Sequence, residues 1–178
     1  MQILLDIVLA LIVIVVLLLL LTAVVNLFIR VPYVPSKKRD IKYVLDLANL
    51  KDNERVYDLG CGDGRFLFAA EKSAKISGTG YEAAPIPYLL SHIKKFFLRA
   101  KSRIHMKNFF KADLSDADVV FCYLGPDVMK NLADKLKKEC KKGTRIFSNT
   151  FHMEGLEPAT VWEKNSDQKH SKIYLYRL

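Results

Sequence analysis

The chain opens with a run of apolar positions that no charge interrupts. Residues 7–29 contain no Asp, Glu, Lys or Arg, and these twenty-three residues would rise about 34 Å as a helix, against roughly 30 Å for the hydrocarbon core of a bilayer. A cleavable signal peptide usually carries basic residues ahead of a shorter apolar core, whereas the only charge before this run is Asp6. The pattern therefore predicts that residues 1–29 form a retained transmembrane anchor rather than a buried helix.

Charges on the two sides of this run predict its orientation. No Lys or Arg precedes the run, and Arg30, Lys37, Lys38 and Arg39 follow it. Because positively charged flanks stay on the cytoplasmic side, we expect a single-pass membrane protein whose remaining residues lie in the cytoplasm. Two prolines in "VPYVPS" at 31–36 predict a stiff, extended exit from the membrane.

Beyond residue 36, apolar runs of strand length alternate with longer segments that are apolar on one face. A helix over 37–50 comes first, with Ser36 as its candidate cap. Pro126 is expected to start the last helix and Gly143 to end it. The pattern predicts strands at 55–59, 76–82, about 104–111, 118–124 and 144–151, helices at 65–74, 88–101 and 126–141, and a terminal hairpin from 159–164 and 171–178.

Alternation of this kind indicates an α/β fold. We expect a Rossmann-like, doubly wound sheet of seven strands, mostly parallel, with a C-terminal antiparallel hairpin and one transmembrane helix ahead of it. The predicted organisation is an anchor at 1–29, a linker and leading helix at 30–54, and the α/β domain at 55–178.

Charge and composition narrow the function classes. All 28 Lys and Arg follow the apolar run together with 18 of the 19 acids, so this part carries 28 − 18 = +10. An anionic membrane leaflet, nucleic acid or plain solvated surface would each explain the excess, and the anchor favours the leaflet. The three cysteines form no CxxC pair, which indicates a reducing compartment, and the four histidines lack metal-ligand spacing, so no metal is predicted.

The segment "VYDLGCGDGRF" at 56–66 places three glycines directly after a predicted strand. In open α/β sheets, ligands bind beyond the carboxyl ends of the strands, and glycine lets a ligand approach the main chain. The spacing G-x-G-x-G differs from the dinucleotide fingerprint, and the Gly-Lys-Ser/Thr of a P-loop is missing. Asp58 and Asp63 disfavour a pyrophosphate and suit a ligand with an ammonium and a sulfonium. The turn therefore predicts S-adenosylmethionine as the cofactor.

Two acids further along the chain support this cofactor. Glu82 ends the second predicted strand, where a carboxylate can accept hydrogen bonds from both ribose hydroxyls. Asp113 follows the third strand, where an acid can accept from the adenine amino group. Taken singly, Glu82 could be a surface acid and Asp113 a helix cap. Their joint placement behind the glycine turn favours the cofactor site.

"VYDLGCGDGR" resembles motif I of the class I, seven-strand methyltransferases. "VPYVPS", "GYEAAP" at 80–85 and the segment 118–140 are similar to the small membrane-anchored protein-lysine methyltransferases that modify the adenine nucleotide translocase and the c subunit of ATP synthase. The resemblance implies that residues 55–178 are a methyltransferase domain, that Glu82 binds the ribose and that Asp113 binds the adenine. It assigns the methionine part of the cofactor to Asp58, Gly60, Gly62 and Gly64, and the neighbouring Cys61 and Leu114 complete the expected site.

The acceptor side of the reaction is less marked in the sequence. The segment after the fourth strand should face the methyl group, which makes Tyr123, Pro126 and Asp127 candidates for substrate contact, while no catalytic base is identified. The D/N/S-P-P-F/Y signature of enzymes that methylate amino groups of DNA is absent, so a nucleic-acid substrate is disfavoured. We expect a membrane-tethered methyltransferase acting on a lysine of a membrane protein. A lipid or small amphiphile as acceptor, or a non-catalytic cofactor-binding domain, are the alternatives.

Overall fold

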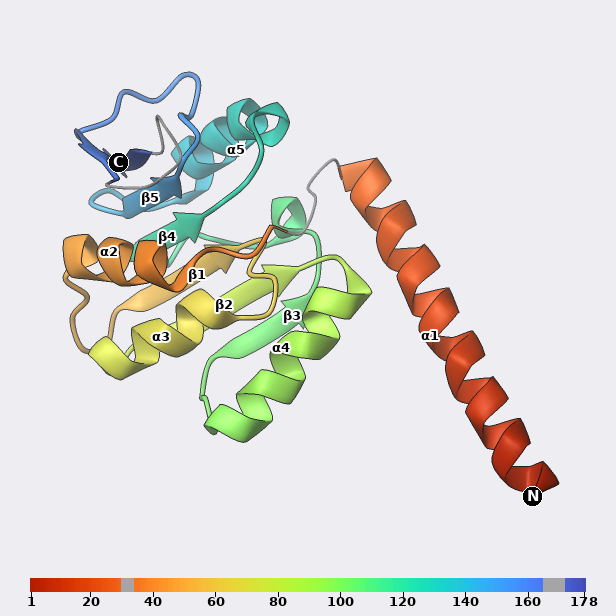
Figure 1. Ribbon diagram of the computed structural model, residues 1–178. Coiled ribbons are helices and arrows are strands. Elements are labelled where there is room, and N and C mark those ends of the chain that lie inside the picture. The colour runs from red at the N-terminus through yellow and green to blue at the C-terminus, as the bar shows by residue number, and fades with distance from the viewer. Residues whose placement is uncertain (30–33, 165–171) are drawn as a thin grey trace.

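The computed structural model describes residues 1–29, 34–164 and 172–178. A long helix, α1 (Gln2–Ile29), extends away from an α/β domain (Figure 1). The side chains of α1 up to Val24 are almost all exposed. By length and composition Gln2–Val24 could cross a membrane, criteria that signal sequences also meet.

The α/β domain is built on one sheet of seven strands in the order β3-β2-β1-β4-β5-β7-β6. The first five strands are parallel, and β7 is antiparallel to both of its neighbours. This confirms the predicted fold class. The elements are α2 (Lys38–Ala48), β1 (Arg55–Leu59), α3 (Arg65–Ser73), β2 (Ser77–Glu82), α4 (Pro85–Leu98), β3 (Arg103–Met106), the 3-10 turn η1 (Phe109–Lys111), β4 (Val119–Cys122), α5 (Pro126–Glu139), β5 (Arg145–Asn149), β6 (Thr160–Glu163) and β7 (Lys172–Arg177).

Both faces of the sheet are covered, as a doubly wound fold requires. In β4 successive side chains point to opposite faces, so that Val119 and Phe121 pack with α2 and α3, while Val120 and Cys122 pack with α5. Helix α4 contacts α3, β2 and β3, and so lies on the same face as α3 (Figure 1). The apolar runs read from the sequence therefore form two cores, one on each side of the sheet.

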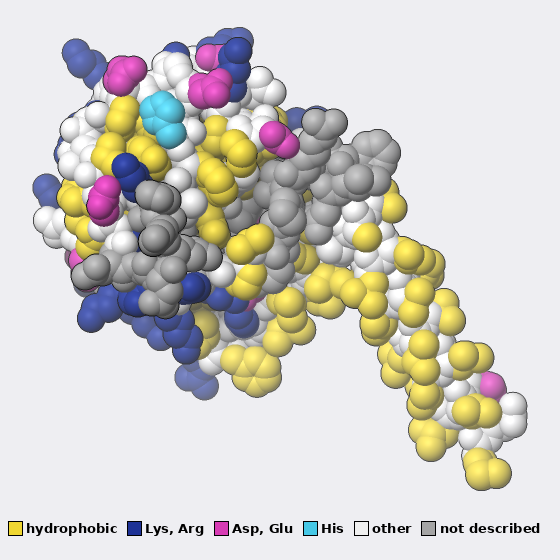
Figure 2. Space-filling model, turned by 45° about the horizontal axis from the view of Figure 1, so that its top comes forward, with side chains coloured by type: hydrophobic (Ala, Val, Ile, Leu, Met, Phe, Trp, Pro, Cys, Tyr) yellow, Lys and Arg dark blue, Asp and Glu magenta, His cyan; other side chains and the backbone are white. Residues whose placement is uncertain are grey.

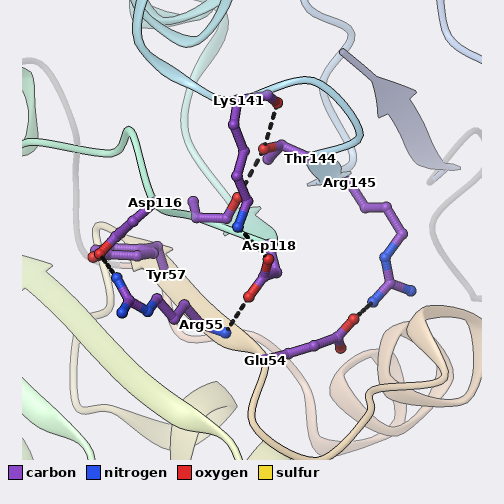
Figure 3. A network of polar contacts seen from close by, with 9 residues as sticks. Glu54, Arg55, Tyr57, Asp116, Asp118, Lys141, Thr144 and Arg145 are labelled. Carbon is purple, nitrogen blue, oxygen red and sulfur yellow. Dashed lines mark hydrogen bonds and ion pairs between the residues drawn. The ribbon is translucent and has the colours of Figure 1, made fainter.

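A network of paired charges closes the amino edge of the sheet (Figure 3). Arg55 pairs with Asp116, and Lys141 Nζ lies 2.5 Å from Asp118 Oδ1. Arg145 Nη2 lies 2.6 Å from Glu54 Oε1. These three ion pairs therefore join residues at or just before the starts of β1, β4 and β5.

One predicted strand was too long. The sequence predicted a strand over about 104–111, but β3 ends at Met106 and residues 109–111 form η1. The physical reason is Asn108, whose side-chain oxygen accepts a hydrogen bond from the Phe110 N–H at 2.9 Å and so turns the chain. The apolar pair Phe109 and Phe110 consequently packs from a turn rather than from a strand.

Three helix ends also differ from the prediction. Lys37, not Ser36, is the N-cap of α2, and no side chain caps it. Helix α4 starts at Pro85 rather than at residue 88, because proline lacks an N–H and fits the first helical turn. Helix α5 ends earlier than expected, at Glu139, and Gly143 instead forms the turn into β5 with φ of 90°.

Some expectations fall outside the described residues. The first half of the proline-containing exit, residues 31–33, and the polar segment between the hairpin strands, residues 165–170, belong to this group. The hairpin itself is confirmed, because β6 and β7 pair antiparallel from Thr160 opposite Leu175 to Glu163 opposite Lys172. The domain boundaries at residues 29 and 54 stay predictions.

Candidate active site

The glycine turn joins the carboxyl end of β1 to α3 and is bonded to the end of β2. The N–H groups of Gly60 and Cys61 donate to the Tyr81 carbonyl at 2.9 and 3.0 Å. Gly60, Gly62 and Gly64 have φ of 75°, 55° and 76°, a backbone region that residues other than glycine rarely adopt. The spacing G-x-G-x-G is therefore a backbone requirement of the turn.

Close packing within the protein adds a second requirement at two of these glycines. A Cβ at Gly60 would lie 2.8 Å from Leu124 Cδ2, and one at Gly64 would lie 2.5 Å from the Phe68 ring. The sequence predicted that the glycines make room for a ligand. At Gly60 and Gly64 the adjoining space is filled by the protein's own side chains.

Glu82 holds the turn from the end of β2. Its Oε2 accepts from the Gly62 N–H at 2.9 Å and its Oε1 accepts from the Ala84 N–H at 2.8 Å. Burial raises the pKa of Glu82, and the hydrogen bonds from Ala84 and Gly62 oppose the rise. The carboxylate thus fixes the two segments between which the predicted ribose site lies, and its contact with a ribose stays a prediction.

Asp58 is a buried carboxylate beside this turn. Its residue is 3% exposed, and in the part of the chain that the structure describes no donor hydrogen-bonds to its side chain. Burial raises the pKa of Asp58 well above its usual value, and the charges of Glu82 and Asp63 raise it further. A cationic ligand group next to Asp58 would offset this cost, as the sequence predicted for the methionine part of the cofactor.

Asp63 has a different role from the one expected. The sequence grouped it with Asp58 as a second acid for a cationic ligand, but Arg65 binds it through Nε at 2.8 Å and Nη2 at 2.6 Å, and Lys94 of α4 pairs with it as well. Burial would raise the pKa of Asp63, yet the hydrogen bonds from Arg65 and Lys94 hold it well below its usual value. Arg65 also donates to the Ser36 carbonyl at 2.9 Å. Asp63 therefore links the turn to α4 and to the segment that follows α1.

The last two predicted cofactor residues lie between η1 and β4. Asp113 is exposed, and its Oδ1 accepts from the Ser115 N–H at 2.9 Å. The backbone and side-chain hydrogen bonds of Ser115 lower the pKa of Asp113. Leu114 is fully buried in the core beneath α5. Contacts of Asp113 and Leu114 with a cofactor stay predictions.

The predicted substrate segment contributes an aromatic wall. Tyr123, at the carboxyl end of β4, stacks on Phe151, which follows β5, with ring centroids 6.3 Å apart. Pro126 and Asp127 are exposed in the first turn of α5. The structure thus brings Tyr123 together with an aromatic residue that the sequence did not single out, because Phe151 lies 28 positions further along the chain.

A buried lysine at the same edge was also missed. The Lys164 side chain, just after β6, is 4% exposed, and its Nζ lies 3.2 Å from Asp40 Oδ2 and 3.4 Å from Thr150 Oγ1. Nζ also donates to the Asn149 side chain. Burial lowers the pKa of Lys164, and the charge of Asp40 opposes this. Asn149 and Thr150, which contact Lys164, stand at the end of a predicted strand, but their sequence does not indicate a contact with a lysine fifteen residues away.

Comparison of the sequence with known protein families identifies the family of this chain. Residues 58–160, more than half of the 178-residue chain, match the family described as the ANTKMT methyltransferase domain. The chain belongs to this family. The matched stretch starts at Asp58 and contains the glycine turn, Glu82 and Asp113, so the residues predicted for the cofactor all lie within it.

Individual relatives of this methyltransferase agree with the family. A protein-lysine N-methyltransferase of Saccharolobus islandicus is 35% identical over 149 residues, which cover 82% of this chain and 92% of that protein. The adenine nucleotide translocase lysine N-methyltransferase of Mus musculus is 32% identical over 146 residues, which cover 81% of this chain and 63% of the mouse protein. The chain therefore spans a little under two thirds of the length of the mouse relative.

Solved structures show the same fold, and one of them contains the demethylated form of the cofactor. The crystal structure of an RNA methyltransferase from Salinibacter ruber, in complex with S-adenosyl-L-homocysteine, has a TM-score of 0.74 and 27% identity, and the match covers 81% of this chain and 93% of that one. This protein is an S-adenosylmethionine-dependent methyltransferase. The buried Asp58 carboxylate, which has no donor among the described residues, fits a cofactor that carries positive charge.

Proposed function

We propose that this methyltransferase, anchored in a membrane by α1, methylates a lysine of a membrane or membrane-bound protein, and that its α/β domain is cytoplasmic. The observation that carries the proposal is one chain that joins a methyltransferase domain, similar to protein-lysine methyltransferases, to an exposed apolar helix of membrane-spanning length. The named acceptors of the relatives, adenine nucleotide translocase and the c subunit of ATP synthase, support a protein as substrate.

In this proposal the residues at the carboxyl edge hold the cofactor. Asp58 and the turn of Gly60, Gly62 and Gly64 would bind its methionine part, Cys61 and Leu114 would adjoin it, and Glu82 and Asp113 would accept from ribose and adenine. The cofactor supplies a methyl group that its sulfonium activates for in-line transfer. The tasks left to the protein are alignment of the acceptor and exclusion of water.

A lysine acceptor adds a requirement that the aromatic wall can meet. Lysine has a reference pKa of about 10.4, so its neutral, nucleophilic form at pH 7 is disfavoured by roughly 3.4 pKa units, or about 4.6 kcal/mol. Packing against the stacked rings of Tyr123 and Phe151 can remove water from the ammonium group, and this desolvation lowers the pKa of the lysine. We propose that these rings guide the lysine side chain toward the glycine turn, with Pro126 and Asp127 at the entrance.

Anchoring would limit which acceptors the enzyme can reach. Helix α1 contacts α4 near its start, where the Ile86 N–H donates to Thr22 Oγ1 at 3.2 Å, close behind Glu82 in the chain. The carboxyl edge would thus stay near the membrane surface. Tethering raises the effective concentration of acceptors in the same membrane, and this gain depends steeply on linker length.

The test incubates the full chain, reconstituted in native membranes, with methyl-labelled S-adenosylmethionine. We expect label in protein, at lysine, with none when Gly62→Val replaces the parent, because a branched side chain would disrupt the turn. Label only in extractable lipid would identify an amphiphile as acceptor, label in RNA would identify a nucleic-acid substrate, and absence of label would indicate a non-catalytic domain. Each of these three outcomes contradicts the proposal.

The anchor is tested by a long Gly/Ser insertion at residue 32 in the full chain, ahead of the Ser36 carbonyl that Arg65 binds. Cofactor binding should not change, whereas methylation of membrane acceptors should fall. Equal rates of labelling would show that tethering does not select the acceptor. Protease added outside intact cells should spare the α/β domain, and digestion from outside would contradict its cytoplasmic location.

A further inference from the structure

Helix α4 presents apolar side chains to solvent. The buried residues of this helix are Pro87 and Ser91, and the Ser91 hydroxyl donates to the Tyr88 carbonyl at 2.6 Å. Phe96 and Phe97 are each 77% exposed. The exposed large apolar side chains of the helix are Leu89, Leu90, Ile93, Phe96, Phe97 and Leu98.

The spacing of these residues makes one continuous face. Leu89, Ile93 and Phe96 repeat at intervals of four and three residues, as do Leu90, Ile93 and Phe97, so all five lie on one side of the helix. A helix that covers a sheet normally turns such a face inward. Contiguous exposed apolar patches on soluble proteins mark sites of contact with another molecule or a membrane.

The chain around α4 is strongly basic. Residues 83–112 contain no Asp or Glu and seven Lys or Arg, against a net charge of +9 for the whole chain. Arg99, Lys101, Arg103 and Lys107 are exposed in the turn after α4 and around the edge strand β3. An apolar helix face next to clustered basic side chains is the pattern by which helices lie on anionic bilayers.

The patch is continuous with the candidate anchor. Thr22 of α1 accepts the hydrogen bond from Ile86, in the first turn of α4, and α4 then runs across the direction of α1 rather than alongside it (Figure 1). Figure 2 shows hydrophobic side chains that continue from α1 onto the adjoining edge of the domain, with Lys and Arg gathered beside them. If α1 crosses a bilayer, α4 is placed to lie along its surface.

We propose that α4 docks on the surface of an anionic phospholipid bilayer, with its apolar face between the acyl chains and the headgroups and the basic residues that follow it against the phosphates. The proposal rests on the proposed anchoring by α1 and adds a second attachment, at the other end of α4. Two attachments fix the rotation of the domain about α1, which a single tether leaves free. A second copy of the chain is the less suitable occupant, because a symmetric contact would bring two strongly basic surfaces together.

The test uses the full chain in nanodiscs that contain phosphatidylglycerol, with Phe97→Trp as reporter and Lys138→Trp, exposed on α5, as the matched control. Trp162 is a background common to both variants. Lipids brominated on their acyl chains should quench the tryptophan at 97 at least threefold more than the one at 138, and acrylamide should do the reverse. Replacing phosphatidylglycerol by phosphatidylcholine should reduce the lipid quenching at 97 at least twofold.

The outcomes separate this inference from the anchor. A carbonate wash of the same protein in vesicles reports on α1 alone. If the chain resists the wash but acrylamide quenches position 97 as strongly as position 138, the anchor stands and docking of α4 is wrong. Protection of position 97 from both quenchers, with two copies per disc, would assign the face to a second copy and overturn the inference. Release of the chain by carbonate would overturn both.

Discussion

Replacing Glu82 is expected to weaken the glycine turn and the cofactor site together. The two oxygens of its carboxylate accept backbone hydrogen bonds of 2.9 and 2.8 Å from Gly62 and Ala84. A hydrogen bond to a charged group contributes about 1.5–3 kcal/mol, so Glu82→Ala loses about 3–6 kcal/mol before relaxation. Burying an ionised carboxylate costs free energy, and its removal recovers part of the lost stability. We therefore expect the free energy of unfolding to fall by about 2–4 kcal/mol.

Glu82→Gln sharpens the same test. An amide oxygen can replace one acceptor, but the amide nitrogen then faces the second backbone N–H, so we expect about half the loss seen with Ala. Glu71→Gln is the matched control, because Glu71 likewise accepts from two backbone N–H groups, those of Lys101 at 2.8 Å and Ser102 at 2.5 Å, away from the glycine turn. Both Gln variants should lose similar stability, while only the one at position 82 should lose cofactor affinity.

Urea unfolding of the full chain in detergent micelles, followed by the fluorescence of Trp162, measures the stability. Calorimetric titration with S-adenosylmethionine measures the affinity. We expect Glu82→Ala to raise the dissociation constant by about 10- to 150-fold, the equivalent of one hydrogen bond to a charged group. Unchanged affinity in the Glu82 variants, or an equal loss in Glu71→Gln, would refute the assignment of Glu82 to the cofactor site.

Three further predictions concern buried groups at the same edge. Asp58→Asn should stabilise the cofactor-free protein, most clearly at high pH. Burial raises the pKa of this carboxyl, so its ionisation lowers the stability of the folded protein as the pH rises above the unfolded pKa of about 3.9. Unfolding from pH 4 to 8 measures the difference in stability between variant and parent, and calorimetry should show weaker cofactor binding by the variant. Gly64→Ala, whose Cβ would lie 2.5 Å from an aromatic ring, should lower the melting temperature by more than Gly143→Ala, where φ is also positive but no atom lies within 4 Å. Lys164→Met should cost about 3 kcal/mol in urea unfolding, because it leaves the Asp40 carboxylate without its buried partner, and the added change Asp40→Asn should recover much of that loss.

Local pattern was enough to predict most of the fold. Short runs such as that of β4, apolar at every position, are typical of strands buried on both faces, and the alternation with helices leaves few topologies besides a doubly wound sheet. The error at 104–111 arose where a side chain competes with the backbone hydrogen bonds of the sheet. The Asn108 side chain accepts a hydrogen bond from the backbone N–H two residues further on, and apolar periodicity gives no sign of such a contact. Helix ends were missed for other reasons: α2 begins without a side-chain cap, and α4 begins at Pro85, ahead of its apolar periodicity.

The site was predicted less completely, because its decisive contacts join distant segments. Sequence reasoning assigned Asp63 to a ligand, whereas Lys94, 31 residues away on α4, neutralises it. Periodicity identified α4 as amphipathic but could not tell that its apolar side faces away from the sheet. In the structure it is Pro87 and Ser91 that α4 buries against the domain.

The order of strands in the sheet has a consequence for how the protein folds. Strand β7 follows β6 in the chain yet lies between β5 and β6, so β6 has no neighbour in the sheet until β7 is in place. The five parallel strands can pair without the hairpin, although β4 must reach back to β1, whereas closure of this end waits for residues 172–177. Until then the edge of β5 is an unpaired template for another strand. Pairing of this hairpin therefore removes an exposed strand edge, although it lies far along the chain from the glycine turn.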